Sequence, residues 1–407
     1  MMLIRNSGNR WYDQALSEMV LEDLDFNHNK DWWCVEGGSQ EVAHRMRAKI
    51  EMNKTSISFG KEVTAMTRSG EDGETIDVSV KSEAANRHYD AVFNSAPLGT
   101  MQRMDLSGLN LNWGTKQAIR SLGYGASCKV GIRFKNLWWI EELGIDSGGV
   151  AKTDLPLRVC VYPSYNLRDK CKPGVKGKPG VLLCSYTWSQ EAQRIAALIN
   201  GKSPQGEEEL RTLLIHDLAK LHSKTGDNAE YKRIHKMISD SYETHYAYDW
   251  YADPGTTGAF AYFGPQQFRN MYPWITRTDG KHIIIGEAAS AHHAWVVGAL
   301  ESAVRGVYQF LFKHSDVNKT AHRALQKYNK GEIKGPWGPL PYEYDREKDV
   351  QYMSTLEKGK VPKREGELAR EQVLFETIRQ KQGGDQLVCE DVTKKDVAPL
   401  LEAAKPA

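Results

Sequence analysis

The sequence lacks the features that mark a membrane-spanning, disulfide-bonded or nucleic-acid-binding protein. No apolar run reaches the roughly 20 residues that a transmembrane helix needs, and MMLIRNSGNRW at the N-terminus is no signal peptide. The cysteines show neither CxxC nor zinc-finger spacing, which favours reduced, buried thiols. With 54 Lys+Arg against 52 Asp+Glu, the net charge of +2 creates no large field for nucleic acid or an anionic membrane. We therefore expect a cytoplasmic globular protein without nucleic-acid or membrane partners.

The sequence also lacks a glycine-rich dinucleotide turn. Gly123, Gly125 and Cys128 come near the GxGxxG pattern but fail at its last glycine, and no strand–loop–helix pattern surrounds them. Lys129 to Phe134 alternates as a strand instead. At 407 residues the chain is long for one domain, so we expect two closely joined domains.

A strand–turn–helix pattern at residues 281–312 is the strongest local signal in the sequence. His282 to Ile285 predicts a buried strand, and Gly286 and Glu287 follow at its C-terminal end. The apolar face of the predicted helix, which starts at Val296, consists of Val297, Leu300, Val304, Val307, Tyr308 and Leu311. Ligands bind at the carboxyl ends of strands in open α/β sheets, and a helix start favours an electron-rich atom. An ordinary strand–helix joint would show the same pattern.

The residue types in this stretch point to a family. GEAASAHHAWVVGALESAVRG, at 286–306, closely resembles the C-terminal flavin motif of the FAD-dependent amine oxidases, above all their L-amino-acid oxidase branch. DWWCVEGGSQEVAHRM and YDAVFNSAPLGTMQRM resemble the segments that enter and leave the family's FAD domain. The resemblance covers most of residues 11–345. It implies a mixed α/β (α+β) fold, in which an incomplete FAD-binding domain joins a mixed-sheet substrate-binding domain and a helical C-terminal tail.

The resemblance also implies a division of the chain. We predict that residues 1–36 belong to the substrate domain, 37–98 to the FAD-binding domain, 99–278 to the substrate-binding domain, 279–315 to the C-terminal motif of the FAD domain, and 316–407 to a peripheral helical tail.

Five residues would hold FAD if the resemblance is carried over. Val63 would offer backbone groups to the adenine end, and Gly286 and Glu287 would lie beside the ribityl-phosphate part. The backbone N–H of Val296 would point at the O2 and N1 edge of the flavin, where a helix N-terminus stabilises the negative charge of the reduced state. Trp250 would pack on the flavin. The helix dipole alone would also favour a carboxylate at Glu287.

Four residues would serve the substrate and O2. Lys129 would hold a water against flavin N5 and assist reoxidation, because a lysine inside an apolar strand needs such a reason. Tyr186 would bind the substrate carboxylate, and Phe260 and Trp295 would wall the pocket. The alternatives are a lysine that points outward and aromatic residues that only fill a core.

The adjacent histidines at 292 and 293 are possible bases. Flavin amine oxidation needs no strong histidine base if the substrate amine arrives neutral. We therefore expect His292 and His293 to be hydrogen-bonded or half-exposed residues without a catalytic task.

The sequence thus predicts an FAD-dependent L-amino-acid oxidase, which forms 2-oxo acids, ammonia and hydrogen peroxide. A monoamine or polyamine oxidase is the near alternative, and a truncated or non-catalytic subunit is the distant one. The family's N-terminal GxGxxG segment and its acidic ribose ligand have no counterpart here. We expect the chain alone to bind FAD weakly or not at all, and to need an N-terminal FAD-domain chain or a homo-oligomer.

Overall fold

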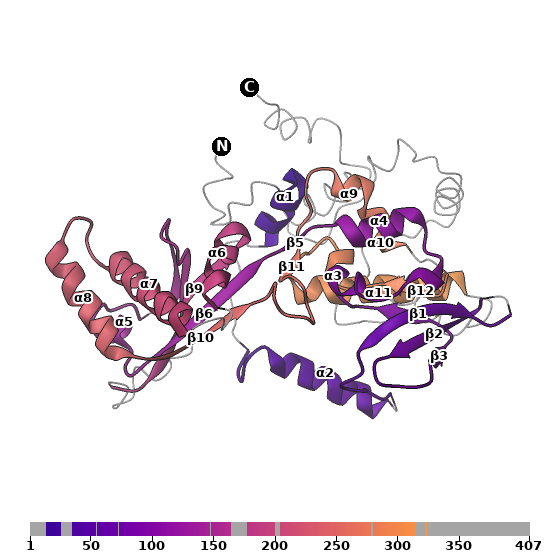
Figure 1. Ribbon diagram of the computed structural model, residues 1–407, viewed down its shortest axis with the longest axis horizontal. Helices are drawn as coiled ribbons and strands as arrows, with labels where there is room; N and C mark the ends of the chain where they lie inside the picture. Colours follow the sequence, from indigo (N-terminus) through magenta and orange to yellow (C-terminus); the bar gives the residue numbers. More distant parts are fainter. Residues whose placement is uncertain are drawn as a thin grey trace, which may run out of the picture.

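The chain forms two lobes that a ribbon of two short strands connects, as the computed structural model shows (Figure 1). The residues that the structure describes are 14–25, 35–53, 55–71, 73–146, 148–163, 177–199, 204–277 and 280–314, together with Arg323. Apart from Arg323, the predicted helical tail at 316–407 lies outside these residues. No helix in the described ranges is long and apolar enough to cross a membrane.

The first lobe is built on a five-stranded antiparallel sheet. Its strands, in spatial order, are β10 (Tyr242–Asp249), β6 (Ser127–Phe134), β9 (Gly180–Trp188), β8 (Val159–Tyr162) and β7 (Gly149–Lys152). The side chains of β6 alternate between the two faces, as the period of a strand requires. Cys128, Val130, Ile132 and Phe134 are fully buried, whereas the residues between them lie on the other face.

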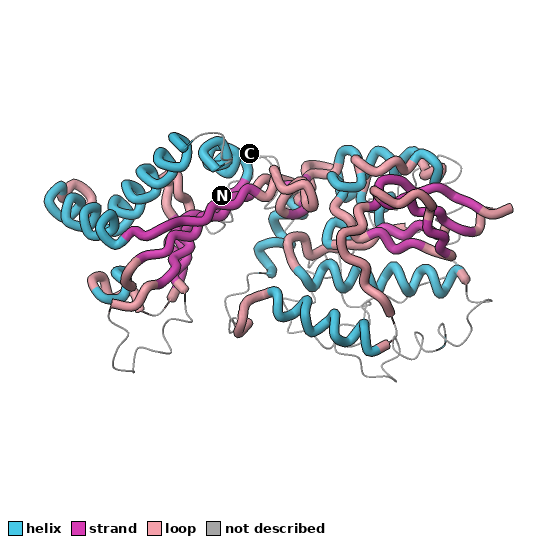
Figure 2. The backbone as a smooth tube through the Cα atoms, turned by 60° about the horizontal axis from the view of Figure 1, so that its bottom comes forward, coloured by secondary structure: helices cyan, strands magenta, loops and turns pink. Residues whose placement is uncertain are grey.

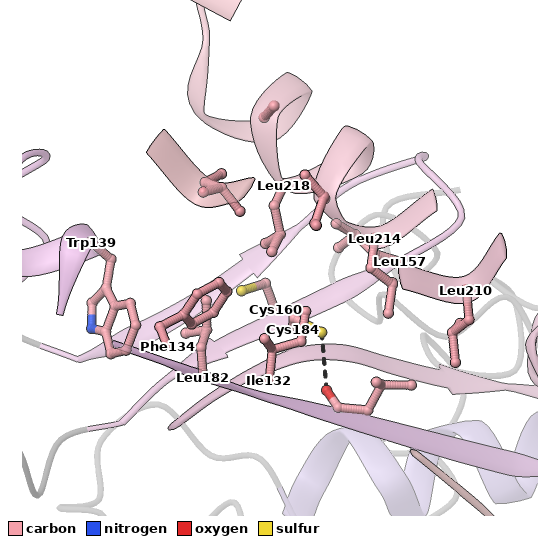
Figure 3. Packing of buried hydrophobic residues seen from close by; sticks show 14 of the residues in the cluster. Ile132, Phe134, Trp139, Leu157, Cys160, Leu182, Cys184, Leu210, Leu214 and Leu218 are labelled. Carbon is pink, nitrogen blue, oxygen red and sulfur yellow. Dashed lines mark hydrogen bonds between the residues drawn. The ribbon is translucent and has the colours of Figure 1, made fainter. Parts of the chain in front are cut away.

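Helices cover the buried face of this sheet. They are α5 (Trp138–Glu141), α6 (Ser189–Ile199), α7 (Pro204–His222) and α8 (Asn228–Ser241). Figure 2 shows the long helices gathered along one side of the strands. Leu210, Leu214 and Leu218 of α7 pack onto the strands (Figure 3). The thiols of Cys128, Cys160 and Cys184 lie free in this core, as expected for reduced cysteines.

The second lobe contains a three-stranded antiparallel sheet and shorter helices. The strands are β1 (Val63–Ser69), β2 (Thr75–Val80) and β3 (Arg87–Tyr89). A hairpin joins β1 to β2, and in it the Gly73 N–H donates to the carbonyl of Gly70 at 3.2 Å. Around the sheet lie α1 (Leu16–Asp25), α2 (Gln40–Met52), α3 (Leu98–Met101), η2 (Ser107–Leu109), α4 (Trp113–Ser121), α9 (Gln267–Asn270) and α10 (Tyr272–Thr276).

A parallel strand pair in the second lobe carries the predicted strand–turn–helix unit. β12 (His282–Ile284) pairs with β4 (Val92–Asn94), although Asn94 and His282 lie 188 positions apart in the sequence. The turn η4 (Glu287–Ala289) and helix α11 (Val296–Lys313) follow β12. The carboxyl ends of both strands therefore meet at the start of the turn, which is the place where open α/β sheets bind ligands.

The face that α11 buries differs from the predicted one. The buried positions are the small residues Gly298, Ser302 and Gly306, whereas Val307 of the predicted apolar face is 40% exposed. A Cβ atom on Gly306 would lie 2.7 Å from Ile285 Cγ2 and 3.1 Å from Ile283 Cγ2. Small residues let the helix backbone approach β12 closely. The prediction considered only the spacing of large apolar residues, so it missed this face.

The two lobes have separate hydrophobic cores. One core lies between the five-stranded sheet and its helices, and the other lies under β1, β2 and the α4 region. The segment 99–278, which we predicted as one substrate-binding domain, contributes residues to both cores. The division of the chain into domains therefore stays a prediction. The connecting ribbon consists of β5 (Tyr124–Gly125) and β11 (Phe260–Ala261). β6 begins two residues after β5, so the ribbon leads directly into the sheet of the first lobe.

The close packing of α11 can be tested at Gly306. We expect Gly306→Val to lower the free energy of unfolding by about 1–3 kcal/mol, because the new side chain would overlap Ile283 and Ile285. Val307→Ala, at an exposed position of the same helix, should change it by less than about 0.5 kcal/mol. Urea unfolding followed by circular dichroism measures both. Equal losses would show that α11 does not pack through its small residues.

Candidate functional site

The open face of the five-stranded sheet contains a hollow of about 480 Å³. This face is exposed to solvent, since Tyr246 is 71% exposed and Val181 is 46% exposed. The residues that line the hollow are Lys129, Gly131, Arg133, Val181, Leu183, Thr244, His245, Tyr246, Tyr248 and Trp250. Its volume lies within the usual range of small-molecule sites.

Lys129 and Tyr186 are neighbours on this face. They lie opposite each other in the pairing of β6 with β9, and Tyr248 lies opposite Lys129 on β10. The Lys129 Nζ lies 4.4 Å from the centre of the Tyr186 ring, which is cation–π geometry. Burial lowers the pKa of Lys129. The structure thus brings together the predicted lysine and the predicted carboxylate-binding tyrosine.

The Tyr186 hydroxyl stays neutral at ordinary pH. Burial raises the pKa of Tyr186, and the ring lies against Trp188 with the two centres 4.0 Å apart. A neutral phenol keeps its proton and can donate a hydrogen bond. The group therefore has the protonation state that binding a carboxylate requires.

Trp250 lies at the end of β10, next to the same group. Its backbone N–H donates to the Ser127 carbonyl at 3.0 Å, and its carbonyl accepts from Gly258 at 3.2 Å. The ring lies 4.8 Å from the Tyr248 ring, centre to centre. Phe260 is half-buried on β11, opposite Gly125. The aromatic segment after β10 therefore forms one wall at the junction of the lobes.

Glu287 connects this wall to the start of α11. Its Oε1 accepts from the backbone N–H of Ala261 at 2.8 Å, and its Oε2 accepts from that of Ala294 at 3.1 Å. The carboxylate thus joins β11 to the turn before the helix. The sequence predicted that Glu287 contacts the cofactor. It did not predict the hydrogen bonds from Ala261 and Ala294, because both come from backbone N–H groups and not from side chains.

Gly286 is required by the backbone. Its φ of 110° lies in the region that favours glycine, and its N–H donates to the Ser302 hydroxyl at 2.8 Å. A Cβ here would lie 3.4 Å from the Ser95 carbonyl oxygen. The ends of β4 and β12 therefore approach each other closely at the predicted ribityl-phosphate position.

The start of α11 presents the other predicted cofactor residues. Trp295 is half-buried, and Val296 is 66% exposed. The first N–H groups of a helix have no carbonyl partner within it and carry partial positive charge. Trp295 and Val296 therefore lie with Gly286 and Glu287 in one group. Val63 lies apart from both groups, on β1, where it pairs with Val80 of β2.

His292 and His293 are both hydrogen-bonded, as expected from the sequence. His292 Nδ1 lies 2.8 Å from Glu301 Oε2 in an exposed pair. His293 Nδ1 lies 2.7 Å from Glu18 Oε1 in a buried pair, and Glu18 Oε2 also accepts from the Phe263 N–H at 2.9 Å. Burial by itself lowers the pKa of His293, but the charge of Glu18 and its hydrogen bond outweigh burial and raise that pKa.

The comparisons with known proteins identify the family. The family model described as flavin containing amine oxidoreductase matches residues 9–309. L-amino-acid oxidase 4 of Hebeloma cylindrosporum is 34% identical over 315 residues, which are 74% of this chain and 48% of that protein. The L-amino-acid oxidase of Siganus canaliculatus is 30% identical over 293 residues, 72% of this chain and 50% of that protein. The chain belongs to the flavin-containing amine oxidoreductase family.

The chain spans about half the length of the curated relatives it matches. Among solved structures, the cyclohexylamine oxidase from Brevibacterium oxydans has a TM-score of 0.46 and 14% identity, over 66% of this chain and 50% of that one. The predicted combination of helices and sheets is confirmed, and FAD is the cofactor of the family.

The described residues fit one end of FAD. A helix N-terminus at Val296 suits an electron-rich ring edge, and the aromatic side chains of Trp250 and Trp295 suit a flat ring. Gly286 has no side chain, so no Cβ atom covers the backbone at this position. The sequence contains no GxGxxG turn for the pyrophosphate. The chain's own residues therefore suit the isoalloxazine and ribityl end.

The buried pair beside this site provides a stability test. We expect His293→Gln to lower the free energy of unfolding by about 3–5 kcal/mol at pH 6, because it leaves the Glu18 carboxylate buried without its counter-charge. His292→Gln breaks an exposed pair and should cost less than about 1 kcal/mol. Urea unfolding at several pH values measures both.

The stabilisation by the pair of Glu18 and His293 changes with pH in a defined direction. The folded pKa of His293 is raised, so the stabilisation is fully present below the unfolded pKa of about 6.5 and is lost as the pH rises through the folded value. The gap in stability between the wild type and His293→Gln should therefore shrink toward alkaline pH. A gap that widened as the pH rose would contradict the assignment of a charged pair.

Proposed function

We propose that the chain takes part in the FAD-dependent oxidative deamination of L-amino acids to 2-oxo acids, ammonia and hydrogen peroxide. The observation that carries the proposal is the contact between Lys129, which lines the aromatic hollow, and the neutral Tyr186 beside it. Membership of the flavin amine oxidase family and the names of the relatives, L-amino-acid oxidases, support it. FAD, when bound, supplies the acceptor for the hydride from the substrate Cα and passes the electrons to O2.

Four residues share the tasks of substrate binding and reoxidation in this proposal. The Tyr186 hydroxyl donates a hydrogen bond to the substrate carboxylate, and Phe260 and Trp295 wall the substrate. Lys129 holds a water at the site of reoxidation. Its burial fits this task, since a lysine with a lowered pKa retains its charge less firmly and accepts or releases a proton more readily.

The cofactor side is assigned to a second set of residues. Gly286 and Glu287 lie beside the ribityl-phosphate part, and the Val296 N–H faces the pyrimidine edge of the ring. Trp250 packs on the ring, and Val63 reaches the adenine end. The hydrogen bonds of Glu287 to Ala261 and Ala294 mean that its carboxylate acts chiefly by fixing backbone around the cofactor.

A monoamine or polyamine oxidase is the second candidate. Tyr186 argues against it. Its hydroxyl is proposed to bind a carboxylate, and an amine substrate without a carboxylate does not need that hydroxyl. A truncated or non-catalytic subunit is the third candidate. We infer that a second polypeptide segment supplies the GxGxxG turn, since this sequence has none and spans about half of its relatives.

Tyr186 is tested in an FAD-loaded form. Tyr186→Phe should raise KM for L-amino acids about tenfold or more and leave kcat nearly unchanged, because the loss of a hydrogen bond to a charged group costs about 1.5–3 kcal/mol. Tyr231→Phe is the control, because its hydroxyl pairs with His216 on the helical side of the first lobe. An unchanged KM across several L-amino acids would remove Tyr186 from the site.

Lys129 is tested by separating the two half-reactions. Lys129→Met should slow reoxidation by O2 far more than anaerobic reduction by substrate, because its task lies in the oxidative half. Lys135→Met, just beyond the same strand, where Nζ donates to the Asp240 carbonyl, should affect neither rate. Stopped-flow absorbance at the flavin band measures both steps. Equal slowing of both by Lys129→Met would indicate a packing defect instead.

A further inference from the structure

Gly131 lies in the floor of the hollow, at the middle of β6. Lys129, Gly131 and Arg133 follow one another on the open face, two residues apart. A glycine inside a strand weakens the strand, and it often marks a place where another group approaches the backbone closely. The pairing with β9 also shifts register between Val130 and Gly131, and such bulges re-aim neighbouring side chains.

The folded chain does not require glycine at this position. Gly131 is not among the residues with positive φ. A Cβ atom here would lie 3.5 Å from Val181 Cγ1 and 3.9 Å from the Leu182 carbonyl oxygen, which are ordinary contacts. Gly180 in the same sheet is different, since its Cβ would lie 2.1 Å from Leu137 Cδ2. Neither a positive φ nor a close contact in the folded chain therefore explains Gly131.

The walls on either side of Gly131 are apolar. Along β10, the rings of Tyr246 and Tyr248 stack with their centres 6.2 Å apart. Val181 and Leu183 line the opposite side from β9. Arg133, at the far end, has its Nε 3.2 Å from Glu243 Oε2, so its charge is paired. The space above Gly131 thus offers apolar contact and no unpaired charge from Arg133.

We propose that Gly131 determines substrate specificity: the side chain that it lacks leaves room for a large apolar side chain, aromatic or long aliphatic, of the amino acid. This inference rests on the proposed function, because it places the substrate in the hollow beside Lys129 and Tyr186. The reacting end lies at Lys129, and the substrate side chain extends over Gly131 between the tyrosines and the aliphatic residues of β9.

The first test measures the fold. Gly131→Ala and Gly131→Val should leave Tm unchanged or raise it, because a Cβ atom here meets only ordinary contacts and strands favour β-branched residues. Val150→Phe, which adds volume at a position of β7 that is 56% exposed and outside the hollow, is the matched control. A large drop in Tm for both Gly131 variants would overturn the inference, because packing would then explain the glycine.

The second test measures binding without turnover. Indole-3-propanoate has the side chain and carboxylate of L-tryptophan but no amino group, so it cannot be oxidised as an amino acid. Isothermal titration of the protein used for the activity assays should give a Kd that rises at least about tenfold in Gly131→Val and stays unchanged in Val150→Phe. An equal Kd in the wild type and Gly131→Val would overturn the inference.

The third test compares substrates in the FAD-loaded form. Gly131→Val should raise KM for L-tryptophan at least about tenfold and KM for L-alanine less than about twofold. Equal rises for both amino acids would overturn the inference. If the wild type oxidises no amino acid, the proposed function fails. Selective weakening of indole-3-propanoate binding by Gly131→Val would then still support the role of Gly131 in shaping the hollow.

Discussion

The carboxylate of Glu287 connects the two groups of site residues. One oxygen accepts from Ala261 on the ribbon that leads into β6, and the other accepts from Ala294 in the turn before α11. This carboxylate therefore helps to place the Lys129 strand relative to the helix N-terminus, together with Glu18, which accepts from Phe263 and pairs with His293. The charge of Glu287 also acts on the ribbon, since burial first, and this charge second, raise the pKa of Tyr124.

The hollow follows from the alternation of side chains in the five-stranded sheet. One set of alternate residues fills the core under the helices, and the other set lies on the open face. An antiparallel sheet can leave one face without a helical layer. On this face the sequence places aromatic rings, aliphatic side chains, a glycine and a lysine. The fold provides an open sheet face. These residue types make that face partly apolar and aromatic, whereas a solvated sheet face would be polar.

Local patterns in the sequence predicted much of the fold. The strand–turn–helix unit at β12 and α11 and the strand of Lys129 both follow from the spacing of apolar residues in the sequence. The pairing of Glu18 with His293 could not be predicted, because 275 residues separate them and neither lies in a distinctive motif. The small-residue face of α11 was missed for another reason. Glycine and serine carry no apolar signal, yet they allow the closest packing.

The central claim is that this chain forms the substrate and isoalloxazine side of a flavin amine oxidase site and lacks its own pyrophosphate-binding turn. The most direct measurement mixes the purified chain with FAD, alone and with a co-expressed segment carrying GxGxxG, then desalts and records the visible spectrum before and after anaerobic addition of L-amino acids. The account predicts a retained flavin band only with the added segment, and bleaching of that band by L-amino acids. A stoichiometric flavin band and steady peroxide release from the chain alone would contradict it.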